Sequence, residues 1–272
     1  MLTSTKNPWI KQLRKLRSRS ERHKQAVCLI EGTHLLERAC EFNYTLSALC
    51  ATPDWIENHT PLWQQAQTQA ERTEIVTAPV LEAIATTVNP DGVIATLSRS
   101  CLQRPFKQPL SLVLALDRLQ DPGNLGTILR SAAATSASGL WLSEDSVDLD
   151  NPKVLRASAG EGLRFPVAVC STIQEAIAHS QGAGLQVVAT LPQAELTYWE
   201  ADFTQPTLLV LGNEGAGLSP ELAAMSDVRV KIPLSAGVES LNVAIAAALL
   251  LYEVQRQRGF QLSVNSQQSS VF

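Results

Sequence analysis

Hydrophobic and polar positions follow two different patterns along the chain. In the first hundred residues, short apolar runs alternate with segments whose apolar residues recur at helical spacing, which predicts a small α/β domain. The predicted strands are Ala26–Ile30, Thr45–Ala51, Ile75–Ala78 and Gly92–Leu97, and the predicted helices are Thr33–Phe42, Leu62–Ala70 and Pro79–Thr86.

The later pattern is that of a parallel sheet with ligand-binding loops. Ser111–Leu116 is a nearly continuous apolar run, typical of a strand that is covered on both faces, and a Pro-Gly turn then leads to a helix from about Asn124. Thr207–Gly212 and Val228–Pro233 are also β-rich, and each opens into a loop of Gly, Ser, Asn or Glu before a helix. Such strand ends are where open α/β sheets bind ligands.

The C-terminal pattern predicts a long helix over Leu241–Arg256. Its Asn242–Tyr252 portion is hydrophobic all round, which predicts burial on most sides. Ser98–Pro109 holds two prolines and three basic residues and is typical of a linker, whereas Gln261–Phe272 is rich in Ser and Gln. We therefore divide the chain into an N-terminal domain over 1–98, a linker over 99–110, a second domain over 111–260 and a disordered tail over 261–272.

Composition indicates a soluble globular protein. The 272 residues are 45% hydrophobic and 18% charged. No apolar run is long enough to span a membrane, and the basic N-terminus lacks the apolar core of a signal peptide. The expected location is the cytoplasm, with no membrane partner.

Cysteine and histidine spacing argues against a metal site. The cysteines lie without any Cys-x-x-Cys pair, and four of the five fall in apolar runs, which favours reduced thiols in the core. The histidines are isolated from one another and from carboxylates at metal-ligand spacing. The five cysteines are Cys28, Cys40, Cys50, Cys101 and Cys170. We therefore predict no metal site.

Positive charge is concentrated at the N-terminus. Residues 1–24 carry eight Lys and Arg against Glu21 alone, so this segment has a charge of +7 while the whole chain has −4. Trp9, Ile10, Leu13 and Leu16 recur at helical spacing, which predicts one amphipathic helix over about 7–24 with a cationic outer face. This face is either a solvated surface or a contact for RNA phosphates.

Three ordered segments carry a family resemblance: Leu116–Ala132 (LDRLQDPGNLGTILRSA), Leu211–Leu218 (LGNEGAGL) and Ile232–Ile245 (IPLSAGVESLNVAI). Together they resemble the motifs of the SpoU (TrmH-like) branch of the SPOUT RNA methyltransferases, over roughly Ser111 to Arg258. The Leu29–Gly32 start resembles an L30e-type substrate domain. The resemblance implies a trefoil-knotted catalytic domain, a homodimer and an enzyme that methylates a ribose 2′-oxygen of structured RNA with S-adenosylmethionine.

The resemblance also implies roles for individual residues. Those at the reaction centre are Arg130, Asn124, Glu214, Ser240 and Asn242, and those that bind the cofactor are Thr190, Leu191, Gly212, Asn213, Gly217, Ile232, Leu241 and Val243. A guanidinium is a poor base because its pKa is about 12.5 or higher, so we assign Arg130 first to gripping phosphate and stabilising the developing alkoxide. General-base action is a family proposal that remains open.

Structural alternatives exist for several of these residues. Asn124 could be only a helix N-cap, and Arg130 only a surface cation. Glu214 could complement the helix N-terminus before Pro220. The C-terminal helix needs a single cap, so we expect one of the pair Ser240 and Asn242 to cap it while the other binds cofactor or ribose.

One segment departs from the family pattern. In Leu155–Gly162 (LRASAGEG), Glu161 stands where relatives commonly have a small residue. Arg156 and Ser158 are still expected to face RNA, and Glu161 puts the identity of the substrate in doubt more than the activity.

Two other functions remain open. Some SPOUT branches methylate a base nitrogen, and a protein that had lost catalysis could act in ribosome assembly by RNA binding alone. The intact motifs favour ribose methylation. The L30e-like domain and the basic N-terminus favour ribosomal over transfer RNA, by analogy.

Overall fold

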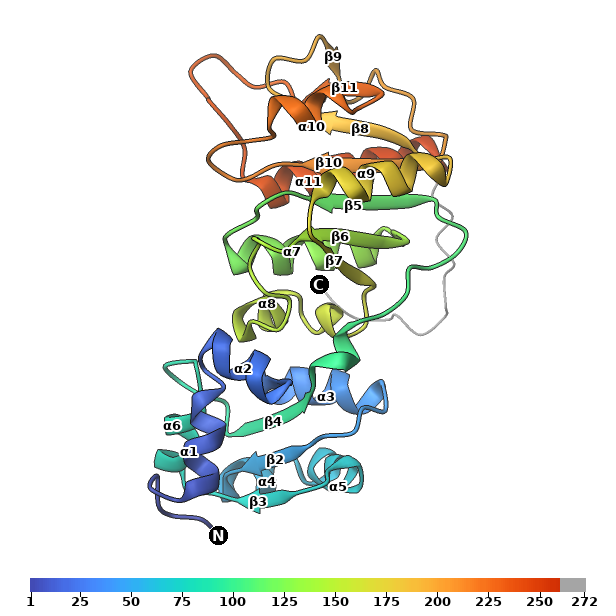
Figure 1. The fold of residues 1–272 in the computed structure, drawn as a ribbon. Helices are drawn as coiled ribbons and strands as arrows, with labels where there is room; N and C mark the ends of the chain where they lie inside the picture. The colour runs from blue at the N-terminus through green and yellow to red at the C-terminus, as the bar shows by residue number, and fades with distance from the viewer. Residues whose placement is uncertain (260–272) are drawn as a thin grey trace.

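The computed structural model describes residues 1–259, and it contains two α/β units that lie end to end (Figure 1). The predicted tail over 261–272 lies outside the described residues. The N-terminal unit consists of α1 (Pro8–Lys15), α2 (Arg19–Gln25), β1 (Val27–Glu31), α3 (Thr33–Glu41), β2 (Ala48–Ala51), α4 (Pro53–Asn58), α5 (Thr60–Gln69), β3 (Thr73–Ile75), α6 (Ala78–Ile84) and β4 (Val93–Ser98). The 3₁₀ turn η1 (Arg99–Leu102) follows it.

The C-terminal unit begins after this turn. It consists of β5 (Leu112–Leu116), α7 (Pro122–Ala134), β6 (Gly139–Ser143), α8 (Pro152–Ala157), the 3₁₀ turn η2 (Glu161–Leu163), β7 (Val167–Cys170), α9 (Ile173–Gly182), β8 (Gln186–Thr190), β9 (Leu196–Thr197), β10 (Thr207–Leu211), α10 (Pro220–Ala224), β11 (Val228–Lys231) and α11 (Val243–Gln257). The predicted α/β class is confirmed in both units.

The C-terminal sheet has the order β7-β6-β5-β10-β8-β11-β9, and every pairing in it is parallel. Its central strands are buried on both faces. Leu112, Leu114 and Leu116 of β5 face a core that includes α7 and α11, while Val113 and Ala115 face the core of α9 and α10. The side chains of β5 thus alternate between two cores, although the whole run is apolar. This packing is expected of a parallel strand between two helical layers.

The N-terminal sheet has the order β1-β4-β2-β3, in which the pairs of β4 are antiparallel and β2 pairs with β3 in parallel. Helices α3 and α5 cover one face, and α1 and α6 cover the other. The first of these cores also takes in Leu155 and Leu163 of the C-terminal unit, so the two units share a hydrophobic contact.

The N-terminal basic segment forms two helices, so the prediction of one helix over 7–24 is wrong. Ser18 adopts an extended backbone (φ −93°, ψ 144°) and its hydroxyl caps α2 by accepting from the N–H of Glu21. The break lets Ile10, Leu13 and Leu16 pack into the N-terminal core while Arg22 of α2 turns toward the C-terminal unit.

Several elements of the structure were not predicted from the sequence, among them β6, β7, α9 and β8. Helix α4 was not predicted, although Thr52 caps it and Pro53 occupies its first position. The predicted linker over 99–110 contains η1, whose Arg99 forms an ion pair with Asp150 at 2.7 Å.

Helix α11 is less enclosed than its sequence predicts. Ile245 and Tyr252 are 52% and 57% exposed, because one stripe of the helix is not covered within residues 1–259. No helix in this described part of the chain is both long and apolar enough to cross a membrane.

The cysteines are free thiols, and four are buried. Burial raises the pKa of Cys40 to about 11 and that of Cys50 to about 12. Burial likewise raises the pKa of Cys170 to about 11. Thiols with such pKa values are inert at neutral pH, in agreement with the predicted structural role.

Candidate active site

The candidate site lies at the carboxyl ends of four strands of the C-terminal sheet. Because β5, β8, β10 and β11 are parallel and close together in the sheet order, the loops that follow them emerge at one edge. These loops carry the three segments that the sequence singled out, together with Thr190 at the end of β8.

All eight residues predicted to bind the cofactor line one open cavity of about 450 Å³. Its walls come from the loops after β8, β10 and β11 and from the start of α11. They include Thr190, Leu191, Gly212, Asn213, Gly217, Ile232, Leu241 and Val243, and also Glu214 and Ser240 from the predicted reaction centre. The tertiary structure therefore gathers residues as far apart in sequence as Thr190 and Val243.

The loop after β10 is folded tightly on itself. Asn213 and Gly217 exchange backbone hydrogen bonds of 3.1 and 2.9 Å, and the side chain of Asn213 accepts from the N–H groups of Gly215 and Ala216. A Cβ on Gly212 would lie 2.2 Å from the carbonyl carbon of Gly217. The close approach of this backbone thus requires a glycine at 212. At 217 the reason for glycine is different, because the φ of 68° is positive.

A chain of side-chain hydrogen bonds joins the three motif segments. The amide of Asn242 donates to Oδ1 of Asn124 (2.8 Å), and the amide of Asn124 donates to Oε1 of Glu214 (3.1 Å). Glu214 also accepts from the N–H groups of Gln120 and Asp121. Asn242 caps α11 through the N–H of Ala244, so one residue both caps the helix and reaches another motif.

The hydrogen bonds around Glu214 control its ionisation. Burial by itself would raise the pKa of this carboxyl, but hydrogen bonds from the backbone of Asp121, from its own N–H, from Asn124 and from Gln120 outweigh burial and hold the pKa below its ordinary value. Glu214 is therefore a carboxylate at neutral pH, suited to ordering the site and not to proton exchange there.

Arg130 and Ser240 are the predicted reaction-centre residues without polar partners. The guanidinium of Arg130 is exposed on α7, does not line the cavity, and makes no hydrogen bond or ion pair within residues 1–259. Ser240 lines the cavity, and no hydrogen bond of its hydroxyl is seen in the same part of the chain. Both side chains are available to a ligand.

Two of the structural alternatives are wrong in detail. Asn124 is not the N-cap of its helix: α7 begins at Pro122, and Asp121 caps it by accepting from the N–H of Asn124 at 2.9 Å. Glu214 does complement a helix N-terminus, but that of α7 and not the one at Pro220. The same carboxylate of Glu214 therefore both stabilises the start of α7 and bonds the predicted reaction-centre residue Asn124.

Of the two residues expected to face RNA, Ser158 does not, and Arg156 has a partner within the protein. Arg156 pairs with Glu31 of the N-terminal unit at 3.0 Å, and Ser158 is fully buried, where its hydroxyl donates to the carbonyl of Leu155. The departure at Glu161 has a structural explanation: its carboxylate pairs with Arg38 at 3.2 Å and Arg164 at 2.7 Å. This segment holds the two units together.

Some residues of the site were not predicted from sequence. Gln120 and Asp121 act through backbone N–H groups, which carry no side-chain signal. Others lie inside the quoted segments or directly follow Leu191, so the same loops supply them. The additional cavity-lining residues include Pro192, Gln193, Leu218, Leu234 and Glu239.

Comparison with known proteins places this geometry in a family. The sequence model of the SpoU rRNA Methylase family matches residues 111–252, and that of the MRM3-like substrate binding domain matches residues 7–95. An uncharacterised tRNA/rRNA methyltransferase of Synechocystis sp. (strain ATCC 27184 / PCC 6803 / Kazusa) is 45% identical over 94% of each chain.

Two further relatives carry more specific names. The 23S rRNA (guanosine(2553)-2'-O)-methyltransferase RlmP of Bacillus subtilis (strain 168) is 30% identical over 93% of this chain and 98% of its own. The crystal structure of an AdoMet-bound rRNA methyltransferase from Sinorhizobium meliloti superposes with a TM-score of 0.82 at 31% identity, covering 94% of this chain and 97% of the other. The family predicted from the three motifs is thus confirmed, and the chain belongs to the SpoU rRNA methylase family.

Proposed function

We propose that this protein transfers a methyl group from S-adenosylmethionine to a ribose 2′-oxygen of ribosomal RNA. The observation that carries the proposal is the single cavity that holds all eight predicted cofactor residues beside the Asn242–Asn124–Glu214 chain of hydrogen bonds. Relatives that match most of this chain are named as 23S rRNA 2′-O-methyltransferases, which supports the reaction and favours ribosomal over transfer RNA.

The cavity fits the proposed cofactor. Thr190 Oγ1 is buried at its wall without a hydrogen-bond partner among the described residues, so a ligand polar group would satisfy it. The charged residues that line the cavity are Glu214 and Glu239, which suits a ligand with a net positive charge. When bound, S-adenosylmethionine supplies an electrophilic methyl group; Gly212, Ile232 and Leu241 would hold it along their loops.

On the acceptor side, we assign Arg130 to the RNA. Its exposed guanidinium can grip a phosphate and stabilise the charge that develops on the ribose oxygen. Asn124 and Glu214 hold the start of α7 and so fix the helix that carries Arg130. Alignment of two bound reactants is worth up to about 7–11 kcal/mol of barrier, so these residues would act mainly by positioning.

The first test is methylation of unmodified total RNA with methyl-labelled S-adenosylmethionine, followed by size separation and nucleoside digestion. Label in a 2′-O-methyl nucleoside of large RNA is expected. Label on a base would overturn the reaction, and tight RNA binding without label would favour the non-catalytic alternative. Arg130→Ala should reduce turnover at least about tenfold, or 1.4 kcal/mol of barrier, at unchanged cofactor affinity.

The N-terminal domain is the proposed RNA-binding part. Lys11, Arg14, Lys15 and Arg17 are exposed on and just after α1, whereas the apolar face of this helix is buried. Exposed cations on one face suit contacts with the phosphate backbone. Arg14→Gln with Lys15→Gln should weaken RNA binding and reduce its salt dependence, and an unchanged salt slope would argue against this face.

We also propose that the enzyme acts in the cytoplasm as a homodimer with a knotted C-terminal segment. The uncovered stripe of α11, with Ile245 and Tyr252 more than half exposed, is the proposed subunit contact. Light scattering should give a dimer for the wild type, and Ile245→Asp should give a monomer. A monomeric wild type at micromolar concentration would refute the dimer.

A further inference from the structure

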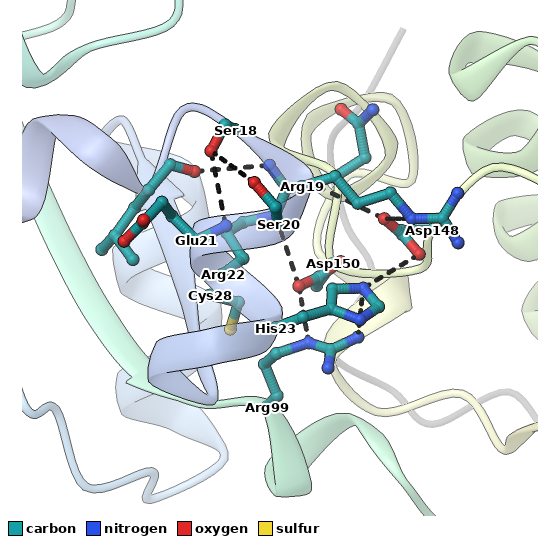
Figure 2. A network of polar contacts seen from close by, with 12 residues as sticks. Ser18, Arg19, Ser20, Glu21, Arg22, His23, Cys28, Arg99, Asp148 and Asp150 are labelled. Carbon is teal, nitrogen blue, oxygen red and sulfur yellow. Dashed lines mark hydrogen bonds and ion pairs between the residues drawn. The ribbon is translucent and has the colours of Figure 1, made fainter.

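A cluster of charged side chains with a buried inner part joins the N-terminal unit to the C-terminal unit (Figure 2). Helix α2 and η1 provide its three arginines and His23, and the loop between β6 and α8 provides its two carboxylates. The members of this interdomain cluster are Arg19, Arg22, His23, Arg99, Asp148 and Asp150.

Asp150 forms the inner part of the interdomain cluster. It is 1% exposed and lies 2.7 Å from Nε of Arg99 and 3.3 Å from Nε of Arg22, which is itself 3% exposed. Asp148 forms the outer part, with Nε of Arg19 at 2.9 Å and Nε2 of His23 at 3.2 Å. The α2 arginines, which the sequence suggested for RNA, are thus directed at the catalytic unit.

The same cluster does not suit a divalent cation. The ligand atoms of His23, Asp148 and Asp150 lie within 4.8 Å of one another, a spacing that a metal could use. However, three guanidinium groups already neutralise the two carboxylates, so a further cation would face a net positive surrounding.

The carboxylate loop is also bonded directly to the first motif. Ser143 Oγ accepts from the N–H of Arg118 (2.8 Å), and Ser146 Oγ accepts from the N–H of Leu119 (3.0 Å). The side-chain amide of Gln120 donates to the carbonyl of Asp145 (2.9 Å), and the N–H of Gln120 donates to Glu214. One short loop therefore connects the interdomain cluster to the residues that order the active site.

We propose that Asp148 and Asp150 are positioning residues, which set the RNA-binding domain against the first motif so that bound RNA meets the reaction centre. The inference rests on the proposed function and adds a role for a charge cluster outside the cavity. Its physical basis is that both carboxylates are largely removed from solvent, with the Asp148 and Asp150 side chains 11% and 1% exposed. Each is therefore costly to leave without its cationic partner, which favours one arrangement of the two units.

The test compares Asp148→Asn with Asp145→Asn, a matched control whose carboxylate is exposed in the same loop and makes no ion pair or side-chain hydrogen bond within residues 1–259. Asp148→Asn should raise the RNA KM about fivefold while kcat and the cofactor Kd change less than about twofold. Asp148→Glu, which keeps the charge, should have an RNA KM between that of Asp148→Asn and that of the wild type. Hydrogen exchange at 118–121 should quicken in Asp148→Asn and not in the control.

A double-mutant cycle with Arg19→Gln separates positioning from direct RNA contact. If Arg19 acts through Asp148, the double variant should have the RNA KM of Asp148→Asn alone. If the two effects multiply, Arg19 acts independently of Asp148, as a direct phosphate contact would, and its contribution to positioning is overturned. An RNA KM and exchange rates that stay at wild-type values in Asp148→Asn would refute the inference, even if the melting temperature fell.

The two proposals fail in different ways. If the wild-type protein methylates RNA and Asp148→Asn behaves in the same way, the positioning role is refuted and the proposed function stands. Wild-type protein that binds RNA but transfers no methyl group removes the function itself.

Discussion

The side chain of Asn242 donates a 2.8 Å hydrogen bond to that of Asn124, although the two residues are 118 positions apart. Because Asn242 also caps α11 and Asn124 also bonds Glu214, this contact ties the last motif to the first two. A change at Asn242 should therefore affect helix stability and the active site separately.

Asn242→Ala should lower the free energy of unfolding by about 1 kcal/mol through the lost cap and should also weaken cofactor binding. Asn242→Ser is the matched control, since serine can cap a helix but is too short to keep the contact with Asn124. We expect Asn242→Ser to regain the stability and not the cofactor affinity. Thermal denaturation and calorimetric titration measure the two effects, and parallel recovery of both would contradict a separate role for the Asn124 contact.

The low pKa of Glu214 predicts an acid limit to stability. Since its folded-state pKa lies below the ordinary value of about 4.3, the carboxylate contributes its full stabilisation above that value and loses it as pH falls through the folded-state pKa. Wild type should lose more stability than Glu214→Gln between about pH 5 and pH 3.

Between about pH 6 and 9, by contrast, Glu214 should not titrate. Any pH dependence of kcat/KM in that range should therefore survive in Glu214→Gln, whatever its residual rate. An ionisation near neutral pH that vanished in this variant would instead make Glu214 a proton carrier.

The tight loop after β10 predicts unequal sensitivity of its glycines. Gly212→Ala should abolish cofactor binding, because the new Cβ would meet the backbone of Gly217 at 2.2 Å. At Gly215, the nearest atom to a new Cβ is the Asn213 side chain at 3.6 Å, an ordinary contact. Gly215→Ala should keep affinity within about threefold, or 0.7 kcal/mol, in a titration with S-adenosylmethionine.

The charge of Glu239 predicts discrimination between cofactor and product. Glu239 lines the cavity and makes no hydrogen bond or ion pair with any residue in 1–259, so its charge is not balanced by the protein there. S-adenosylmethionine carries a sulfonium charge that S-adenosylhomocysteine lacks. Glu239→Gln should therefore weaken the cofactor more than the product, by about threefold in the ratio of Kd values. Equal weakening of both ligands would mean that Glu239 contacts a part that the two ligands share. The control is Glu221→Gln, on the exposed start of α10.

The sequence by itself determined the α/β class, the family and the loops that line the cavity. Continuous apolar runs indicated buried parallel strands, and Gly-rich loops at their ends indicated the ligand edge, because both depend on local chemistry and short-range periodicity. The second and third motifs supply most of the cavity wall as two nearly contiguous pieces, and Thr190 and Leu191 add a third.

The tertiary structure decided which residues meet across the chain. It paired Asn242 with Asn124, turned Arg156 and Glu161 into contacts between the units, and directed Arg19 and Arg22 at Asp148 and Asp150 instead of at solvent. No local pattern specifies these pairs, because a charged or amide side chain looks the same in sequence whether its partner is water, RNA or a residue a hundred positions away. Only the packing of the two units selects the partner.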